Sequence, residues 1–246
     1  MRNIKFIVGG ILMLISCSKV EDRACVKSVG EETTLEILTP QIDRLFLHEH
    51  LEYVLVQDTV EKVVLIGGKN LLNFVIVDVS SGLLDISNTN KCNFLRSYKK
   101  KIRVEIHFIE LINIHFEGTE SLTNKDTLQF NWMTFLIRDG AGPVALNFNA
   151  DVIYATVSHG WGDFTFNGTV NYANLNVRSN GFCDTYGLKV KDSLTVISNT
   201  QGYVKVNANK VKFKSQIDLD GDIYYKGTPT LIKFNQFGKG VLIDAN

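Results

Sequence analysis

The second half of the chain repeats a short pattern in which a glycine follows a β-prone run and a polar turn. The repeating residues are Gly140, Gly160, Gly181, Gly202 and Gly221, spaced 20, 21, 21 and 19 residues apart. A fixed period of about 20 residues with one turn per period is typical of a β-solenoid. Stacked coils pair their strands at about 4.8 Å and bury a continuous core. We therefore expect these glycines at corners that need a positive φ or have no room for a Cβ.

The rest of the chain supports an all-β fold. From Val54 onward it is rich in Val, Ile and Phe, and no helical stretch of ten or more residues is expected after Val60. Between Ile102 and Phe108 the even-numbered residues are apolar and the odd-numbered ones polar, which predicts a strand with one buried face. The segment from 43 to 56 is compatible with a helix or a strand. An antiparallel sandwich would repeat every 8–12 residues. The period and the handedness rule for parallel connections favour a right-handed parallel β-helix.

The first residues are typical of a secretory signal. Arg2 and Lys5 precede an apolar run of about ten residues, which is too short to span a bilayer as a helix and has no polar face. The sequence Leu-Ile-Ser-Cys at positions 14–17 resembles a bacterial lipobox, which predicts a diacylglycerol on Cys17 and cleavage before it. We therefore expect a signal peptide over 1–16, a lipidated linker over 17–41 and a β-helix over 42–246.

The charge balance bears on the expected binding partner, and the cysteine content bears on possible disulfides. Lys+Arg and Asp+Glu each number 26, so the balance gives no reason to expect nucleic acid as a partner. Cys25, Cys92 and Cys183 remain besides Cys17, and outside the cytosol two of the three could form a disulfide.

Histidine and acidic motifs provide weak metal candidates. His48 and His50 would lie on one face of a strand, but two ligands do not make a zinc site and no third is identifiable. His107 and His115 lie in separate strand runs. The sequence Asp-Leu-Asp-Gly-Asp at 218–222 has the spacing of the first half of a calcium loop, but Pro229 stands where the bidentate Glu belongs. We expect solvated side chains and a glycine corner here, with no metal and no cofactor.

Candidate residues for catalysis and glycan binding are scattered. The acidic residues near the glycines stand at different offsets from them, so we expect no catalytic cluster; they are Asp139, Asp163, Asp184, Asp220 and Asp222. Several aromatic residues could form an outer strip for glycans or pack under turns; they are Trp132, Trp161, Tyr172, Tyr186, Tyr203, Tyr224 and Tyr225.

Three stretches together resemble a known family. They are residues 70–87, residues 101–122, and the run Ile-Asp-Leu-Asp-Gly-Asp-Ile-Tyr-Tyr-Lys-Gly-Thr-Pro at 217–229. They resemble the putative auto-transporter adhesin head domain, also called the GIN domain or DUF2807, and the likeness covers roughly 42–243. The resemblance implies a right-handed β-helix on secreted or lipid-anchored bacterial proteins, without catalytic residues. Family turns often read Ser-Gly-Ser-Gly, whereas residues 139–142 and 159–162 read Asp-Gly-Ala-Gly and His-Gly-Trp-Gly.

These observations lead to one expected function and one alternative. We expect a module lipid-anchored at the outer membrane or cell surface of a Gram-negative bacterium, which adheres to a glycan, a protein or its own copies without catalysis. The alternative is a carbohydrate-active lyase or hydrolase on the same scaffold. A groove lined by two or three acidic side chains would favour the enzyme, and a flat polar lateral face would favour the binding module.

Overall fold

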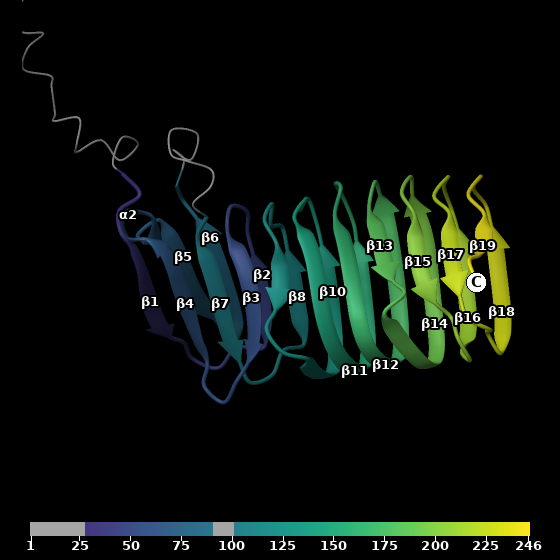
Figure 1. Ribbon diagram of the computed structural model, residues 1–246, viewed down its shortest axis with the longest axis horizontal. Helices are drawn as coiled ribbons and strands as arrows, with labels where there is room; N and C mark the ends of the chain where they lie inside the picture. The colour runs from purple at the N-terminus through teal and green to yellow at the C-terminus, as the bar shows by residue number, and fades with distance from the viewer. Residues whose placement is uncertain (1–27, 91–100) are drawn as a thin grey trace, which may run out of the picture.

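The computed structural model describes residues 28–90 and 101–246. They form a β-solenoid of about seven turns, whose parallel strand pairings are about 20 residues apart in the sequence (Figure 1). The coils follow one another along the long axis of the molecule, and the strands run across it. The all-β solenoid expected from the glycine period is therefore confirmed.

Two strips of parallel strands face each other across the core. The front sheet stacks β6, β2, β8, β10, β11, β12, β14, β16 and β18 in that order. Its short strands are β6 (Leu83–Asn88), β2 (Arg44–Leu47), β8 (Asn113–Phe116), β16 (Lys212–Ile217) and β18 (Leu231–Gln236). The back sheet contains β7 (Arg103–Phe108), β3 (Glu52–Gln57), β9 (Leu122–Asn124), β13 (Phe182–Thr185), β15 (Val204–Asn207), β17 (Ile223–Lys226) and β19 (Leu242–Asp244).

Four long strands bend around the coil and connect its sides. They are β10 (Leu128–Ile137), β11 (Pro143–Val157), β12 (Asp163–Ser179) and β14 (Leu188–Thr200). The first residues of β11 and β12 pair in the back sheet, and the last residues of all four pair in the front sheet. Between these parts, Leu128, Phe148, Gly168 and Leu188 pair in turn along a third, short side. The bend between the short side and the front sheet therefore recurs on successive coils.

The interior is filled by alternating apolar side chains. Along β7 and the residue before it, the even-numbered residues from Ile102 to Phe108 are at most 3% exposed, and the odd-numbered ones face outward as expected. Aromatic rings continue the core through later coils, with the centroids of Phe148 and Phe166 5.1 Å apart in a T-shaped pair. Burying each such ring contributes roughly 1.5–3 kcal/mol. The coils are thus joined by both backbone pairing and a shared core.

The predicted corner glycines lie in one column. Ideal Cβ atoms on Gly140 and Gly160 would meet the carbonyl oxygens of Gly118 and Gly140, at 3.1 and 3.4 Å. The same contact recurs for Gly202 over the Gly181 carbonyl and for Gly221 over the Gly202 carbonyl. A Cβ on Gly181 would meet Val157 at 2.7 Å. Of the five predicted glycines only Gly160 has a positive φ, at 84°, so close stacking explains the other four.

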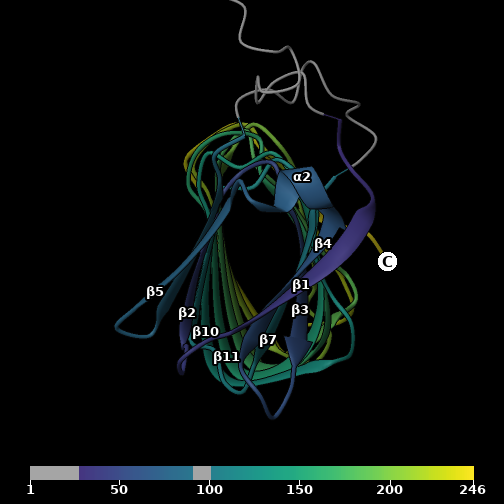
Figure 2. The same ribbon diagram turned by 90° about the vertical axis from the view of Figure 1, so that its left-hand side faces the viewer.

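Antiparallel strands close the N-terminal end. β1 (Glu32–Leu38) pairs antiparallel with β4 (Lys62–Gly68), β4 pairs antiparallel with β7, and β5 (Val75–Ser80) pairs antiparallel with β6. The short helix α2 (Lys69–Leu72) buries Leu71 and Leu72 against the core. Figure 2 looks along the axis onto this end, where β1 crosses in front of the coils and α2 lies at their rim. These elements cover strand edges that would otherwise be open.

In the first half of the chain, the structure corrects one sequence prediction and resolves one ambiguity. The linker expected over 17–41 is wrong for residues 32–38, which form β1. Most side chains of β1 are exposed because it is an outermost strand, and this explains the polar composition that suggested a linker. The ambiguous segment 43–56 forms β2 and β3. The coil made by β2 and β3 lies between the β6–β7 layer and the β8–β9 layer, so stacking order departs from chain order.

Candidate binding surface

An aromatic ladder stands on the outer face of the front sheet. It consists of Trp132, Tyr154 and Tyr172, from the consecutive strands β10, β11 and β12. The ring centroids of Trp132 and Tyr154 are 5.9 Å apart, and so are those of Tyr154 and Tyr172. Trp132 is 46% exposed and Tyr154 38%. Three adjacent rings thus present a partly exposed aromatic surface across three coils.

The strand register creates this ladder. In β10, buried Met133, Phe135 and Ile137 alternate with outward residues, and Trp132 is one of the outward positions. In the strand register, Trp132 stands opposite Val152, and Val152 stands opposite Tyr172. Tyr154 lies two residues further along β11, in the neighbouring column of outward positions. The three rings therefore zigzag between two neighbouring columns.

A polar hollow lies beside the ladder, at the bend between the short side and the front sheet. Its volume is about 510 Å³, and it is lined by Gln129, Phe130, Asn131, Asn149, Ala150, Asp151, Thr169, Asn171 and Lys191. Asn171 Nδ2 donates a hydrogen bond to Asp151 Oδ1 at 2.7 Å, which joins two coils. Amide, hydroxyl and carboxylate groups therefore surround a space next to exposed aromatic rings.

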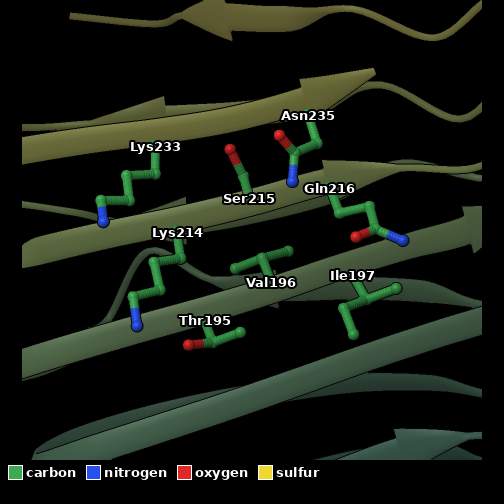
Figure 3. A pocket seen from close by; sticks show the side chains of 8 residues that line it. All are labelled: Thr195, Val196, Ile197, Lys214, Ser215, Gln216, Lys233 and Asn235. Atoms are coloured by element: carbon green, nitrogen blue, oxygen red, sulfur yellow. The ribbon is translucent and has the colours of Figure 1, made fainter. Parts of the chain in front are cut away.

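A second hollow, the lysine hollow, lies further along the same sheet toward the C-terminal end. Its volume is about 370 Å³, and it is lined by Thr195, Val196, Ile197, Lys214, Ser215, Gln216, Lys233 and Asn235. Figure 3 shows Lys214 and Lys233 extending side by side from neighbouring strands, with Gln216 and Asn235 on the other side of the hollow. The register pairs Lys214 with Lys233 and Gln216 with Asn235.

The chemistry of this surface suits recognition of a polar polymer. Aromatic faces pack against the C–H faces of sugar rings, and the Tyr hydroxyls and nearby amides can hydrogen-bond to sugar hydroxyls. The lysine hollow is open on the front sheet and the polar hollow at its bend, and strand stacking at about 4.8 Å repeats the contacts along the solenoid. The arrangement presents a lateral face on which aromatic rings and polar groups lie near each other.

The structure groups only part of the predicted aromatic strip. Trp132 and Tyr172 meet, but the ring between them, Tyr154, was absent from the predicted set. Its signal was its outward position in an alternating strand, one coil from each of the other two. The remaining aromatics lie elsewhere: Tyr203 packs on Phe182, Tyr186 lies under Lys226, Tyr224 donates to Asp222 and Tyr225 packs on Phe213. Trp161 is 65% exposed in the turn before β12.

Two of the histidines, His48 and His115, lie near the same carboxylate, and His48 Nδ1 is 4.0 Å from Glu117 Oε2. His50 is exposed in a turn with a φ of 67°, while His48 Nε2 lies 3.1 Å from Asp85 Oδ1. His115 Nε2 lies 3.1 Å from Glu117 Oε1, and partial burial lowers the pKa of His115. Across the described ranges, no group of three or more His, Cys, Asp or Glu side chains is placed to hold a metal ion.

His107 instead holds two strands of the back sheet together. Its Nδ1 lies 2.8 Å from Asp58 Oδ2, at the end of β3. The hydrogen bond from His107 lowers the pKa of the Asp58 carboxyl, and a bond from the Thr59 N–H adds to the effect. The arrangement is a structural contact next to a turn.

Of the acidic residues near the glycines, Asp184 and Asp222 accept hydrogen bonds from backbone N–H groups in turns. Asp222 Oδ1 accepts the Val241 N–H at 2.8 Å, and Asp184 Oδ1 accepts the Tyr186 N–H at 3.1 Å. Asp218, the first acid of the calcium-like run, accepts from Gln216 Nε2 at 2.8 Å. Burial raises the pKa of Asp163 at the start of β12. These carboxylates have separate partners on separate turns, and none of them hydrogen-bonds to another in the described residues.

Lipidation of Cys17 and a possible disulfide were predicted from the four cysteines of the sequence. Cys17, Cys25 and Cys92 lie outside the described residues, so lipidation of Cys17 stays a prediction. Cys183 is buried with a free thiol, and burial raises its pKa well above the usual value. Over residues 28–90 and 101–246, no helix has the length and apolar character needed to cross a membrane.

Comparison with solved structures supports the fold. The chain is similar to a putative adhesin from Bacteroides fragilis, with a TM-score of 0.75 at 19% identity over 86% of this chain and 96% of that one. It is also similar to a putative lipid binding protein from Parabacteroides distasonis, with a TM-score of 0.61 at 20% identity over 87% and 97%. A putative adhesin from the same species gives 0.62 at 18% identity over 87% and 96%. Identities this low show a shared fold.

Comparison at the sequence level identifies the family. A search against functionally curated proteins gave no match. The family model described as "Putative auto-transporter adhesin, head GIN domain" matches residues 42–229, which is more than half of the chain. The chain therefore belongs to this family, DUF2807.

Proposed function

We propose that this protein is a lipid-anchored adhesion module that binds an extended polysaccharide along the front sheet, without catalysing its breakdown. The observation that carries the proposal is the aromatic ladder of Trp132, Tyr154 and Tyr172, partly exposed beside the polar hollow. Family membership supports a role in adhesion. A long, regular sheet suits a repeating ligand because each coil offers a similar contact at a regular spacing.

The anchor in this proposal is the expected lipid on Cys17. Residues 18–31 would then connect it to β1, which begins at Glu32. The tether would place the N-terminal end of the solenoid nearer the membrane and leave the lateral face accessible. The resemblance to a lipobox and the relation to adhesins support a location at the cell envelope.

Binding is favoured over catalysis by the arrangement of the acids. A glycosidase needs two carboxyl groups about 5–9.5 Å apart across one sugar position. In the polar hollow, Asp151 is the one acidic residue among those that line it, and it accepts a hydrogen bond from Asn171. The lysine hollow is lined by no acidic residue. Neither hollow therefore offers a pair of carboxylates for acid–base chemistry.

Affinity electrophoresis in gels that contain a polysaccharide tests the proposal. A panel of neutral and acidic polymers, including dextran and polygalacturonate, should retard the protein in at least one case. Trp132→Ala should weaken that binding by about tenfold, because one stacking surface is lost, and Tyr154→Ala should act similarly. Trp161→Ala is the matched control, since this Trp is exposed but lies outside the ladder.

The outcome separates the two functions. Equal binding by Trp132→Ala and Trp161→Ala, or binding to no polymer in the panel, would contradict the proposal. Reducing-end and unsaturated-product assays on the same polymers test the enzyme alternative. Turnover that is abolished by replacing one of the aspartates would support a carbohydrate-active enzyme instead.

A further inference from the structure

The lysine hollow and the aromatic ladder share one continuous surface. The register pairs Tyr154 with Asn174, Asn174 with Thr195, Thr195 with Lys214, and Lys214 with Lys233. The first four of these side chains are on the outer face, because their neighbours in the strand are buried. Lys233 lies on the same face, because it pairs with Lys214 and extends beside it (Figure 3). A ligand that lies along this column would pass from the ladder directly into the lysine hollow.

The two lysines carry uncompensated charge. Among the described residues, neither Lys214 nor Lys233 has an acidic side chain within ion-pair distance, whereas Lys212 pairs with Asp192 at 3.3 Å and Lys101 with Glu120 at 2.6 Å. Like charges opposite each other on paired strands are destabilising. The sheet therefore keeps two adjacent ammonium groups that do not serve its own stability, although the whole chain is electrically balanced.

Neutral hydrogen-bonding groups complete the hollow. Thr195 precedes the lysines in the same column, and the amides of Gln216 and Asn235 form the next outward column. The Gln216 amide donates one hydrogen bond to Asp218, so the carboxylate beside the hollow has a partner of its own. Ammonium, hydroxyl and amide groups are the donors that bind carboxylate and sulfate oxygens.

We propose that the lysine hollow binds the anionic group of an acidic polysaccharide whose chain continues over the aromatic ladder. The inference rests on the proposed function and adds the charge of the ligand to it. Both a carboxylate and a sulfate group provide the oxygens that the two ammonium groups require. The hollow, at about 370 Å³, is larger than one such group and accommodates part of the sugar ring that carries it.

Binding of three polymers by the folded protein tests the inference: polygalacturonate, which carries carboxylates, dextran sulfate, which carries sulfates, and uncharged dextran. We expect the acidic polymers to bind more tightly than dextran, and the affinity to fall as salt rises from low to high concentration. Lys214→Gln with Lys233→Gln should weaken binding of the preferred acidic polymer by about tenfold or more. It should leave the melting temperature unchanged or slightly higher, because a like-charge contact is removed.

The matched control is Lys125→Gln with Lys210→Gln, which changes the net charge equally at exposed positions outside the front sheet. The control should retain nearly the full affinity. Equal losses in both double variants would show a general charge effect and overturn the inference. Binding that depends on Trp132 but not on Lys214 and Lys233 would also overturn it and leave the proposed function standing. Binding to none of the three polymers would contradict the inference itself. Preference between polygalacturonate and dextran sulfate identifies the anionic group.

Discussion

Gly160 and Gly202 occupy the same column of corners for different physical reasons. Gly160 has a φ of 84°, a conformation that L-residues other than Gly adopt rarely. Gly202 has no positive φ, but a Cβ there would run into the carbonyl oxygen of Gly181 in the coil below and approach the Phe182 ring at 2.9 Å. Replacing either glycine is therefore costly, through backbone strain in one case and close stacking in the other.

The close-stacking account predicts the effect of Gly202→Ala. The added methyl group forces two coils apart, and overpacking of this kind costs about 1–3 kcal/mol. A loss of this size should lower the melting temperature by roughly 2–4 °C per kcal/mol in a chain of this length. Gln201→Ala is the control, because the adjacent side chain is exposed. A melting temperature of Gly202→Ala equal to that of the control would contradict the close approach.

The aromatic residues show that the local sequence pattern does not reveal which rings meet in space. Trp132 and Tyr172 were both candidates for an outer strip, but nothing in their local sequence says that their rings belong together. Tyr154 connects them because the coils place its outward position between the two. Tyr225 was a candidate as well, yet it packs on Phe213 at the edge of the core.

At the scale of elements, β3 and β7 are joined by more than backbone pairing. β7 pairs with β3 from Arg103 to Phe108, and His107 contacts Asp58 just beyond the end of β3. His107 Nε2 also lies 3.8 Å from Glu105 Oε2, so two carboxylates face this imidazole. The contact connects the layer nearest the N-terminal cap to the coil that follows it.

This contact predicts a pH dependence. Because the pKa of Asp58 is lowered in the folded state, its contribution to stability is present above its unfolded pKa of about 3.9 and is lost as pH falls through the folded value. Thermal melts of the wild type and of Asp58→Asn between pH 7 and pH 2.5 measure it. The wild type should be more stable at neutral pH, and the difference should narrow below about pH 4. A difference that stays constant over the whole range would show that the charge is irrelevant.

Strand assignment from sequence succeeded where the alternation was strong. The buried face of β7 was predicted residue by residue, because period-two alternation is a local property. β1 was mistaken for linker because an outermost strand with exposed side chains shows little alternation, and its pairing with β4 is a contact between distant segments.

At the scale of the whole molecule, the two ends of the solenoid differ within the described residues. Antiparallel β1, β4 and β5 cover the N-terminal end, whereas every residue of β18 in the last coil is exposed. The chain leads from the predicted anchor to the closed end, and the lysine hollow lies at the other end of the sheet. An anchored molecule would therefore hold the hollow away from the membrane.

The anchor itself makes a prediction for the full-length chain. Metabolic labelling with a fatty-acid analogue, in a bacterium that processes lipoproteins, should mark the wild type and direct it to the membrane fraction. Cys17→Ala should lose the label, because the thiol is the acceptor, and Cys25→Ala should retain it. Equal labelling of Cys17→Ala and the wild type would rule out the lipobox interpretation.

The sequence by itself determined the repeat length, the inward and outward positions of strands such as β7, and the positions of the glycine corners, because each leaves a regular pattern in the order of residues along the chain. Only the tertiary structure decided that the β2–β3 coil lies between the β6–β7 and β8–β9 layers, that β1 closes the end, and that Tyr154 completes the ladder. Only it placed Lys214 beside Lys233 in line with that ladder. These features depend on which distant strands pair and in which register, and a shift of one residue would turn every outward side chain inward.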